Sequence, residues 1–371
     1  MGTLGETQTP SHPLRFGAIS GYLLKLLRES TRLTQTELAE LLGVDPSTVY
    51  AWESGRRPLA GLRAGDLTRV RMLLSRHGAP PVGTALLTDS LEADLIIGDT
   101  LALDLDTVAL PAHPLAVGVH QRTLANLITW PITGRPPAQL AELGGPRGRG
   151  PRPDRPVLSI PERHQFFDNL LQLADRCRSP DDALLRRQAT YLLGFDDRPD
   201  STHWLSGELN HALNCLESDN APGWLRARSS AIALAATGDR EPLHAYLTRL
   251  YDDHAQELTN LTYYAYWVGE LGSATLTDDT ALFEADPRHW SGTQLLRHLL
   301  DRLRPGAEQA DLYTHTLAEL IASHPYLLAA DPATRQFLGV VVDQMSGDAD
   351  LSSQARRDLA NLAYAARLAR P

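Results

Sequence analysis

The chain has 371 residues, a formal net charge of −10 at pH 7, 43% hydrophobic residues and 6% aromatic residues. This length allows two or three domains, and the apolar content is sufficient for ordinary buried cores. Two cysteines, Cys177 and Cys215, are too few for a disulfide framework. Without a charged-then-apolar leader or an apolar run of about 20 residues, we expect a cytoplasmic protein with no membrane partner.

The charge is unevenly distributed along the chain. Residues 1–78 hold ten Lys and Arg residues against seven Asp and Glu residues, a net charge of +3. Because the whole chain carries −10, the remaining residues carry −13. Such asymmetry is typical of a basic nucleic-acid-binding module joined to an acidic partner domain.

Signals for short helices are dense in the first 60 residues. Apolar residues recur at helical spacing over 21–30. The Thr34-x-x-Glu37 capping box predicts that a second helix begins there, and Gly43 predicts its end. Asp45 followed by Pro46 predicts the start of a third helix. Two short helices joined by a glycine-containing turn are typical of a helix-turn-helix.

The outward residues of that third helix lie near its N-terminus, where this motif contacts base edges. The segments "LTQTELAELLGV" (33–44) and "STVYAWESGRRP" (47–58) resemble the Cro/repressor-like (XRE) helix-turn-helix family of transcriptional regulators. Each signal alone also occurs in purely structural helical hairpins. Their ordered combination, followed by paired arginines, favours DNA binding.

The resemblance implies roles for individual residues. The positions that match base-reading residues are Pro46, Ser47, Tyr50 and Ala51. The positions that match phosphate-contacting residues are Gln35, Thr48, Arg56 and Arg57. A buried ion pair that ties the first helix to the recognition helix matches Arg28 and Glu53. Because Pro46, Ser47 and Ala51 offer few bidentate hydrogen bonds to bases, we expect DNA shape to contribute to recognition.

The middle of the chain changes character twice. An amphipathic helix over 66–77 completes a five-helix DNA-binding domain at 1–80, and two apolar helices near 90–103 and 114–130 form a connector over 81–130. Residues 131–157 contain seven prolines and five glycines, which predicts a linker or loop. Within it "PRGRGPRP" resembles an AT-hook core that contacts the minor groove. We favour a solvated loop over a DNA-contacting segment.

Residues 158–371 have helical periodicity in nearly every segment. About ten helices joined by short turns predict an all-α protein whose C-terminal domain is a mostly antiparallel, repeat-like array. The pattern Leu-x-Asn-Leu recurs at 124–127, 258–261 and 359–362, at spacings near multiples of the 34-residue tetratricopeptide period. The layout resembles XRE-family regulators of the actinobacterial type, which have a long helical C-terminal domain.

Two further clusters have both a structural and a functional interpretation. His211 and Cys215 are spaced i,i+4 near Glu208, as in half a zinc site, but packing or surface roles are favoured. One five-residue stretch contains four aromatic side chains: Tyr263, Tyr264, Tyr266 and Trp267. Core packing is the favoured interpretation, and a groove for a peptide or small-molecule effector is the alternative. No catalytic motif is present, so we predict no enzyme activity, cofactor or metal.

The favoured function is a sequence-specific transcriptional regulator that binds double-stranded DNA as a homodimer. Its C-terminal domain is expected to provide dimerisation and effector sensing, and the bound protein would be associated with the nucleoid. The main alternative is a DNA-binding maintenance or scaffold factor for a plasmid or chromosome. An enzyme with a DNA-targeting module is a third interpretation.

Overall fold

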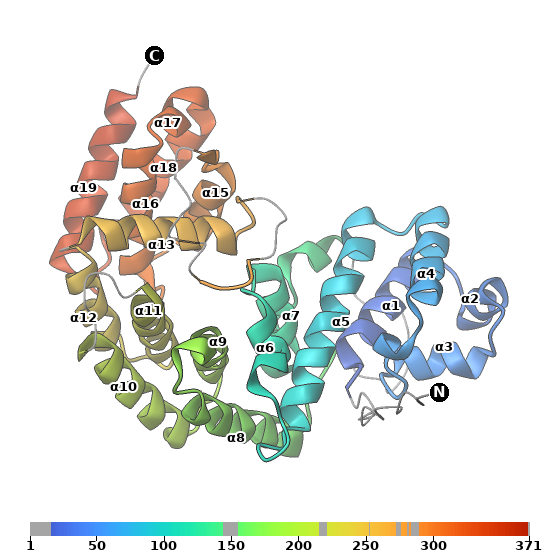
Figure 1. The fold of residues 1–371 in the computed structure, drawn as a ribbon. Helices are drawn as coiled ribbons and strands as arrows, with labels where there is room; N and C mark the ends of the chain where they lie inside the picture. The colour runs from blue at the N-terminus through green and yellow to red at the C-terminus, as the bar shows by residue number, and fades with distance from the viewer. Residues whose placement is uncertain are drawn as a thin grey trace, which may run out of the picture. The chain divides into compact units, whose positions relative to one another are not determined.

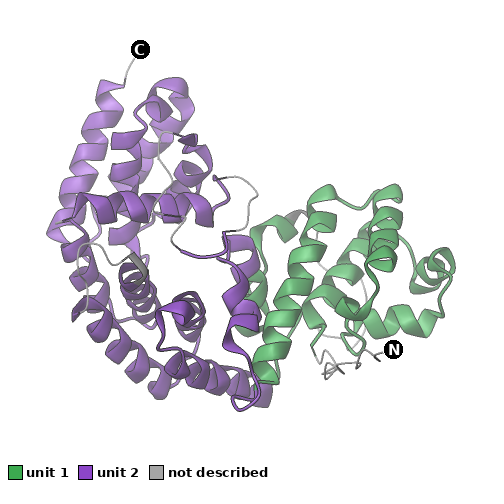
Figure 2. Ribbon diagram, viewed as in Figure 1, with its two compact units in different colours: residues 1–103, 126–159 green, residues 104–125, 160–371 purple. Residues whose placement is uncertain are grey.

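The computed structural model describes residues 16–143, 155–214, 221–251, 253–271, 276–279, 282 and 289–369. Within these ranges the chain forms helices joined by turns and contains no strand, so the protein is all-α, as predicted (Figure 1). It divides into two compact units (Figure 2). Unit 1 comprises Met1–Leu103 and Asn126–Ser159, and unit 2 comprises Asp104–Ala125 and Ile160–Pro371. No described helix is long and apolar enough to span a bilayer.

Unit 1 contains the predicted helix-turn-helix and the helices around it. In chain order its elements are α1 (Ala18–Ser30), α2 (Gln35–Leu42), α3 (Pro46–Glu53), a 3-10 turn at Leu59–Gly61, α4 (Ala64–Arg76), α5 (Pro81–Leu101), the greater part of α7 (Arg122–Thr133) and a 3-10 helix at Ala138–Leu143. The predicted caps are present. Thr34 and Glu37 form a reciprocal capping box, Gly43 has a φ of 71°, and Asp45 caps α3 by accepting from the Ser47 amide at 2.8 Å.

Helix α1 lies at the centre of unit 1 and contacts both α3 and α5. Its side chains Ile19, Leu23 and Leu27 are 0% exposed. At Gly21 a Cβ atom would lie 2.2 Å from the Trp52 carbonyl oxygen, so α1 and α3 approach more closely than any side chain allows. Only glycine permits this contact between the two backbones.

Helix α5 provides the N-terminal cap of α1. The Asp94 carboxylate accepts the amides of Ile19 and Ser20, each at 3.0 Å, and the Ser20 hydroxyl at 2.5 Å. A carboxylate is favourable at this end of a helix because the free N–H groups point at it. Burial nevertheless raises the pKa of Asp94 to about 6. These bonds explain why α5 belongs to unit 1 and not to a separate connector.

The division of the chain therefore differs from the predicted domains. Helix α5 begins at Pro81, well before the expected position near 90. The helix expected over 114–130 is two helices, α6 (Pro114–Val117) and α7. Residues 131–143 and 155–157 of the predicted linker belong to unit 1, where the amide of Leu158, just after the linker, donates to the Pro131 carbonyl at 3.3 Å. The AT-hook-like segment lies outside the described residues.

The break between α6 and α7 has a tertiary cause within unit 2. The Gln188 side chain donates to the carbonyls of Leu115 and Gly118 at 2.7 and 3.0 Å. The Val119 amide donates to the Leu276 carbonyl at 2.8 Å. Because these groups find partners outside the segment, the backbone at Gly118 is extended (φ −167°, ψ 160°) and not helical.

Unit 2 is a succession of helices that mostly contact their neighbours in sequence, such as α8 with α9 and α10 with α11. After α6 its α-helices are α8 (Ile160–Arg176), α9 (Ala183–Leu193), α10 (Pro199–Asn214), α11 (Ala221–Ala236), α12 (Glu241–Leu250), α13 (His254–Trp267), α15 (Thr293–Arg302), α16 (Ala310–Ser323), α17 (Tyr326–Ala330), α18 (Pro332–Met345) and α19 (Ser353–Leu368). Contacts between α16 and α19 join segments further apart in sequence.

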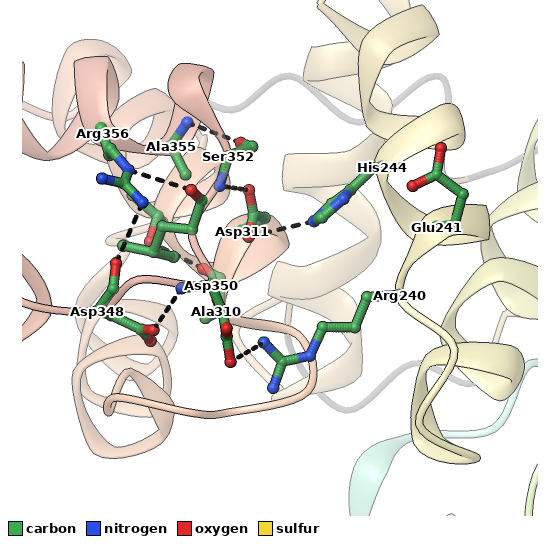
Figure 3. Close-up of polar contacts among 12 residues, drawn as sticks. Arg240, Glu241, His244, Ala310, Asp311, Asp348, Asp350, Ser352, Ala355 and Arg356 are labelled. Atoms are coloured by element: carbon green, nitrogen blue, oxygen red, sulfur yellow. Dashed lines mark hydrogen bonds and ion pairs between the residues drawn. The ribbon is translucent and has the colours of Figure 1, made fainter.

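Polar contacts connect α12 to the last helices of unit 2 (Figure 3). Arg240 pairs with Asp350 at 3.2 Å, and His244 lies 3.6 Å from a carboxylate oxygen of Asp311. The other Asp311 oxygen accepts the Ser352 amide at 3.0 Å. These contacts hold α12, the start of α16 and the loop before α19 together.

Candidate nucleic-acid interface

The helix-turn-helix is braced by a buried ion pair between α1 and α3. The Arg28 guanidinium donates to both oxygens of the Glu53 carboxylate, from Nε at 2.5 Å and from Nη2 at 3.1 Å. Its Nη1 donates to the Leu33 carbonyl at 2.7 Å, just before α2. The two side chains are 9% and 2% exposed. The ion pair predicted from the sequence is thus present and joins three segments.

Gln35 participates in the same cluster. Its side-chain amide donates to the Glu53 Oε2 atom at 2.6 Å, which joins the first turn of α2 to the end of α3. The structure thus gives Gln35 a bracing role inside the motif, and its phosphate contact stays a prediction. No sequence signal predicts this bond, because the two residues meet only after α2 and α3 have packed.

The exposed surface of α3 lies at its N-terminal end. Pro46, Ser47 and Tyr50 are exposed, with Tyr50 at 38%, and Thr48 is half-buried. Ala51 is only 7% exposed, so its predicted role in base reading is wrong. The turn after α3 folds back over Ala51, and the Arg57 amide donates to its carbonyl at 3.0 Å.

That turn presents two arginines beside the exposed end of α3. Arg56 and Arg57 are both exposed, and the Arg56 guanidinium lies 5.7 Å from the centre of the Tyr50 ring. Such a cation–π contact places positive charge next to the candidate base-reading side chain. Gly55 has a φ of 71°, and a Cβ there would lie 3.0 Å from the Ala18 backbone. The turn is therefore set tightly against the start of α1.

Helix α4 contributes further positive charge to unit 1. Val70 and Leu74 are buried, as expected, while Arg69 and Arg76 are exposed. Arg69 also donates to the Leu41 carbonyl at 3.3 Å, near the end of α2. Helix α4 thus contacts α2 through Arg69, and Arg69 and Arg76 lie on its outer side.

The aromatic segment of α13 is part of the core of unit 2. Tyr263, Tyr264 and Tyr266 are 5%, 3% and 2% exposed, and Trp267 is half-buried. The Arg228 guanidinium lies 4.4 Å from the ring centres of both Tyr263 and Tyr264. The three tyrosine rings therefore pack in the core, which agrees with the favoured interpretation and leaves them too little exposed surface to line an effector groove. Only Trp267 is partly exposed.

The half-zinc interpretation near α10 also finds no support in the described residues. Glu208 accepts hydrogen bonds from both Arg186 and Arg226, at 2.5 to 3.0 Å. His211 lies on the exposed side of α10, and Cys215 is outside the described residues. The Glu208 carboxylate is committed to ion pairing.

Comparison with known proteins agrees with the geometry of unit 1. A family model described as a helix-turn-helix domain matches residues 21–87, from α1 to the first turns of α5. No curated protein and no solved structure showed a match to the chain. Unit 1 therefore carries a helix-turn-helix domain, a class of fold that points to DNA binding.

Proposed function

We propose that the protein is a sequence-specific regulator of transcription that inserts the N-terminal half of α3 into the major groove. The observation that carries this proposal is the exposed group formed by Ser47, Tyr50, Arg56 and Arg57 on a braced helix pair. The bracing matters because recognition requires side chains held in a fixed geometry.

The chemistry of this surface suggests how a site would be read. The Ser47 and Tyr50 hydroxyls each donate and accept hydrogen bonds, and Pro46 offers an apolar surface for a thymine methyl group. Arg56 and Arg57 would neutralise phosphates at the edge of the groove. With so few base-reading groups, the DNA shape would supply part of the specificity.

Dimerisation is part of this proposal. One helix-turn-helix covers a half-site, and a dimer covers two half-sites one helical turn apart. Unit 2 holds 20 Arg residues against 32 Asp and Glu residues, a net charge of −12. This charge opposes phosphate binding, so we assign unit 2 to dimerisation and to sensing a peptide or small molecule. Membership of the XRE family and the tetratricopeptide-like character of unit 2 stay predictions.

Because the tyrosines of α13 are buried in the core, we propose a different site for the effector. A cavity of about 660 Å³ opens among α8–α11 of unit 2. Its lining includes Trp204, whose ring lies 5.3 Å from the Arg186 guanidinium, and also His203 and Arg226. Arg186 and Arg226 are both paired with Glu208, which also lines the cavity, so the aromatic face of Trp204 is the feature that suits an aromatic effector.

The test of the proposed function is the DNA that the full chain selects. Random duplexes should yield a short palindromic motif after several rounds of selection. Mapping of bound sites in cells should place that motif upstream of genes whose transcription changes when the protein is removed. Selection without any enriched motif would contradict the proposal. Enrichment of repeated motifs near a replication origin, without transcriptional change, would favour a maintenance factor.

A further inference from the structure

Three metal-binding side chains converge in unit 2, far along the chain from the helix-turn-helix. Glu257 lies on α13, and His315 and Glu319 lie one turn apart on α16. One ligand atom from each residue lies within 4.8 Å of the other two. Helix α16 contacts both α13 and α19, so this cluster lies inside one packed group of helices (Figure 1).

His315 is buried and its Nε2 atom has no hydrogen-bond partner in the part of the chain that the structure describes. The side chain is 2% exposed. Nε2 lies 3.7 Å from a Glu257 oxygen, which is too long for a hydrogen bond. It is close to the separation of about 3.3 Å between two ligands bonded to one zinc ion at about 2.0–2.1 Å.

The other side of the His315 ring faces a carboxylate from a third helix. Nδ1 lies 3.5 Å from an Asp358 oxygen on α19. The Tyr251 ring packs edge-on against the imidazole, with centroids 4.2 Å apart, and its hydroxyl lies 3.5 Å from the same carboxylate. A carboxylate behind one nitrogen favours the tautomer that leaves the lone pair of the other nitrogen free for a metal.

The charge of the cluster also favours a cation. Two of the three ligand side chains are carboxylates, and a third carboxylate, Asp358, lies beside His315. One divalent ion would offset the charge of the two ligand carboxylates. The Glu257 side chain is 15% exposed, so the cluster is open to ions from solvent.

We propose that Glu257, His315 and Glu319 form a binding site for one divalent transition-metal ion, with Asp358 as the positioning residue behind His315. One imidazole and two carboxylates suit zinc better than magnesium or calcium, which prefer oxygen ligands alone. A water molecule would complete a four-coordinate site. The ion would link α13 to α16. The sequence does not reveal this site, because Glu257 lies on another helix, far along the chain from His315 and Glu319.

The experiment uses untagged full-length protein that has been treated with a chelator. Titration with ZnCl₂ against a chromophoric competitor should show one tight site per chain, and CoCl₂ should give the visible absorption of a four-coordinate ion. Zinc should also raise the melting temperature. Magnesium at the same concentration should do neither.

Variants identify the ligands. Glu257→Gln and Glu319→Gln should each weaken zinc binding at least tenfold, and Asp358→Asn should weaken it about 10- to 100-fold. Glu308→Gln, an exposed carboxylate outside the cluster, is the matched control and should bind as the parent does. His315→Asn removes Nε2. If that variant does not fold, the two glutamine variants decide the question.

The zinc-free form of Glu319→Gln provides a second readout. Removing a carboxylate from this acidic cluster should leave the zinc-free protein at least as stable as the parent, while the stabilisation by zinc is lost. Absence of stoichiometric zinc binding would overturn the proposal. So would zinc binding that is unchanged in both glutamine variants, because the ion would then be bound outside this cluster.

Discussion

Glu53 joins three segments of the helix-turn-helix through its two carboxylate oxygens, which accept hydrogen bonds from Arg28 and Gln35. Replacing Arg28 by Ala should destabilise unit 1 by about 3–5 kcal/mol, because the Glu53 carboxylate would stay buried without its guanidinium. Hydrogen exchange of the amides in α1 and α3, measured in the full chain, reports this loss locally.

The control for this prediction replaces both charges. An Arg28→Met and Glu53→Leu double variant should regain much of the lost stability, since no buried charge remains unpaired. Unchanged amide protection in Arg28→Ala would show that the pair contributes little.

Base reading and phosphate contact make different predictions for neighbouring residues. Ser47→Ala and Tyr50→Ala should each weaken binding to the selected DNA by about 1–3 kcal/mol and affect random DNA much less. Tyr50→Phe keeps the ring beside Arg56 and so separates the hydroxyl from the cation–π contact. Fluorescence anisotropy on both DNAs measures the difference.

Arg57→Ala is the matched comparison for these variants. It should weaken binding to both DNAs equally and lower the salt dependence by about one phosphate contact. Equal losses on both DNAs for Ser47→Ala and Tyr50→Ala would remove these residues from base recognition.

At the scale of elements, the close contact of α1 with α3 depends on Gly21. Gly21→Ala would place a Cβ 2.2 Å from the Trp52 carbonyl oxygen, so α3 must shift. We expect a loss of about 1–3 kcal/mol, as for other overpacked sites, together with weaker DNA binding. Thermal unfolding followed by circular dichroism and DNA titration measure the two effects.

Gly65 provides the control, because a Cβ there meets nothing within 4 Å. It lies in the first turn of α4, where alanine is a better helix former than glycine, so Gly65→Ala should be neutral or stabilising. A Gly21→Ala variant that melts and binds DNA like the parent would show that α1 and α3 separate easily.

At the scale of the whole molecule, the proposed dimer predicts how binding responds to DNA architecture and salt. The full chain should bind a palindromic site with two chains per duplex. Its affinity should fall more steeply between 50 and 200 mM salt than on a single half-site, because two modules then contact phosphates. Sedimentation and anisotropy measure stoichiometry and slope. Equal slopes and one chain per duplex on both DNAs would contradict dimeric binding.

Local rules were sufficient for much of unit 1. The capping box at Thr34, the glycine stop at Gly43 and the Asp45 cap depend on residues within a few positions, so the sequence alone predicted α2 and α3. The Arg28–Glu53 ion pair could be predicted only from the resemblance to the Cro/repressor-like family. The sequence does not predict the burial of Ala51, because this burial depends on a turn that folds back after the helix ends.

By itself the sequence determined that the protein is all-α, that its basic N-terminal part holds a helix-turn-helix, and where those helices are capped. Only the tertiary structure decided that α5 caps α1, that Gly118 breaks a helix and that the α13 aromatics lie in a core. It alone brought Glu257 to His315. The physical reason is range: caps and periodicity act within one or two turns, whereas these contacts join residues that are separated by tens of positions and meet only when the helices pack.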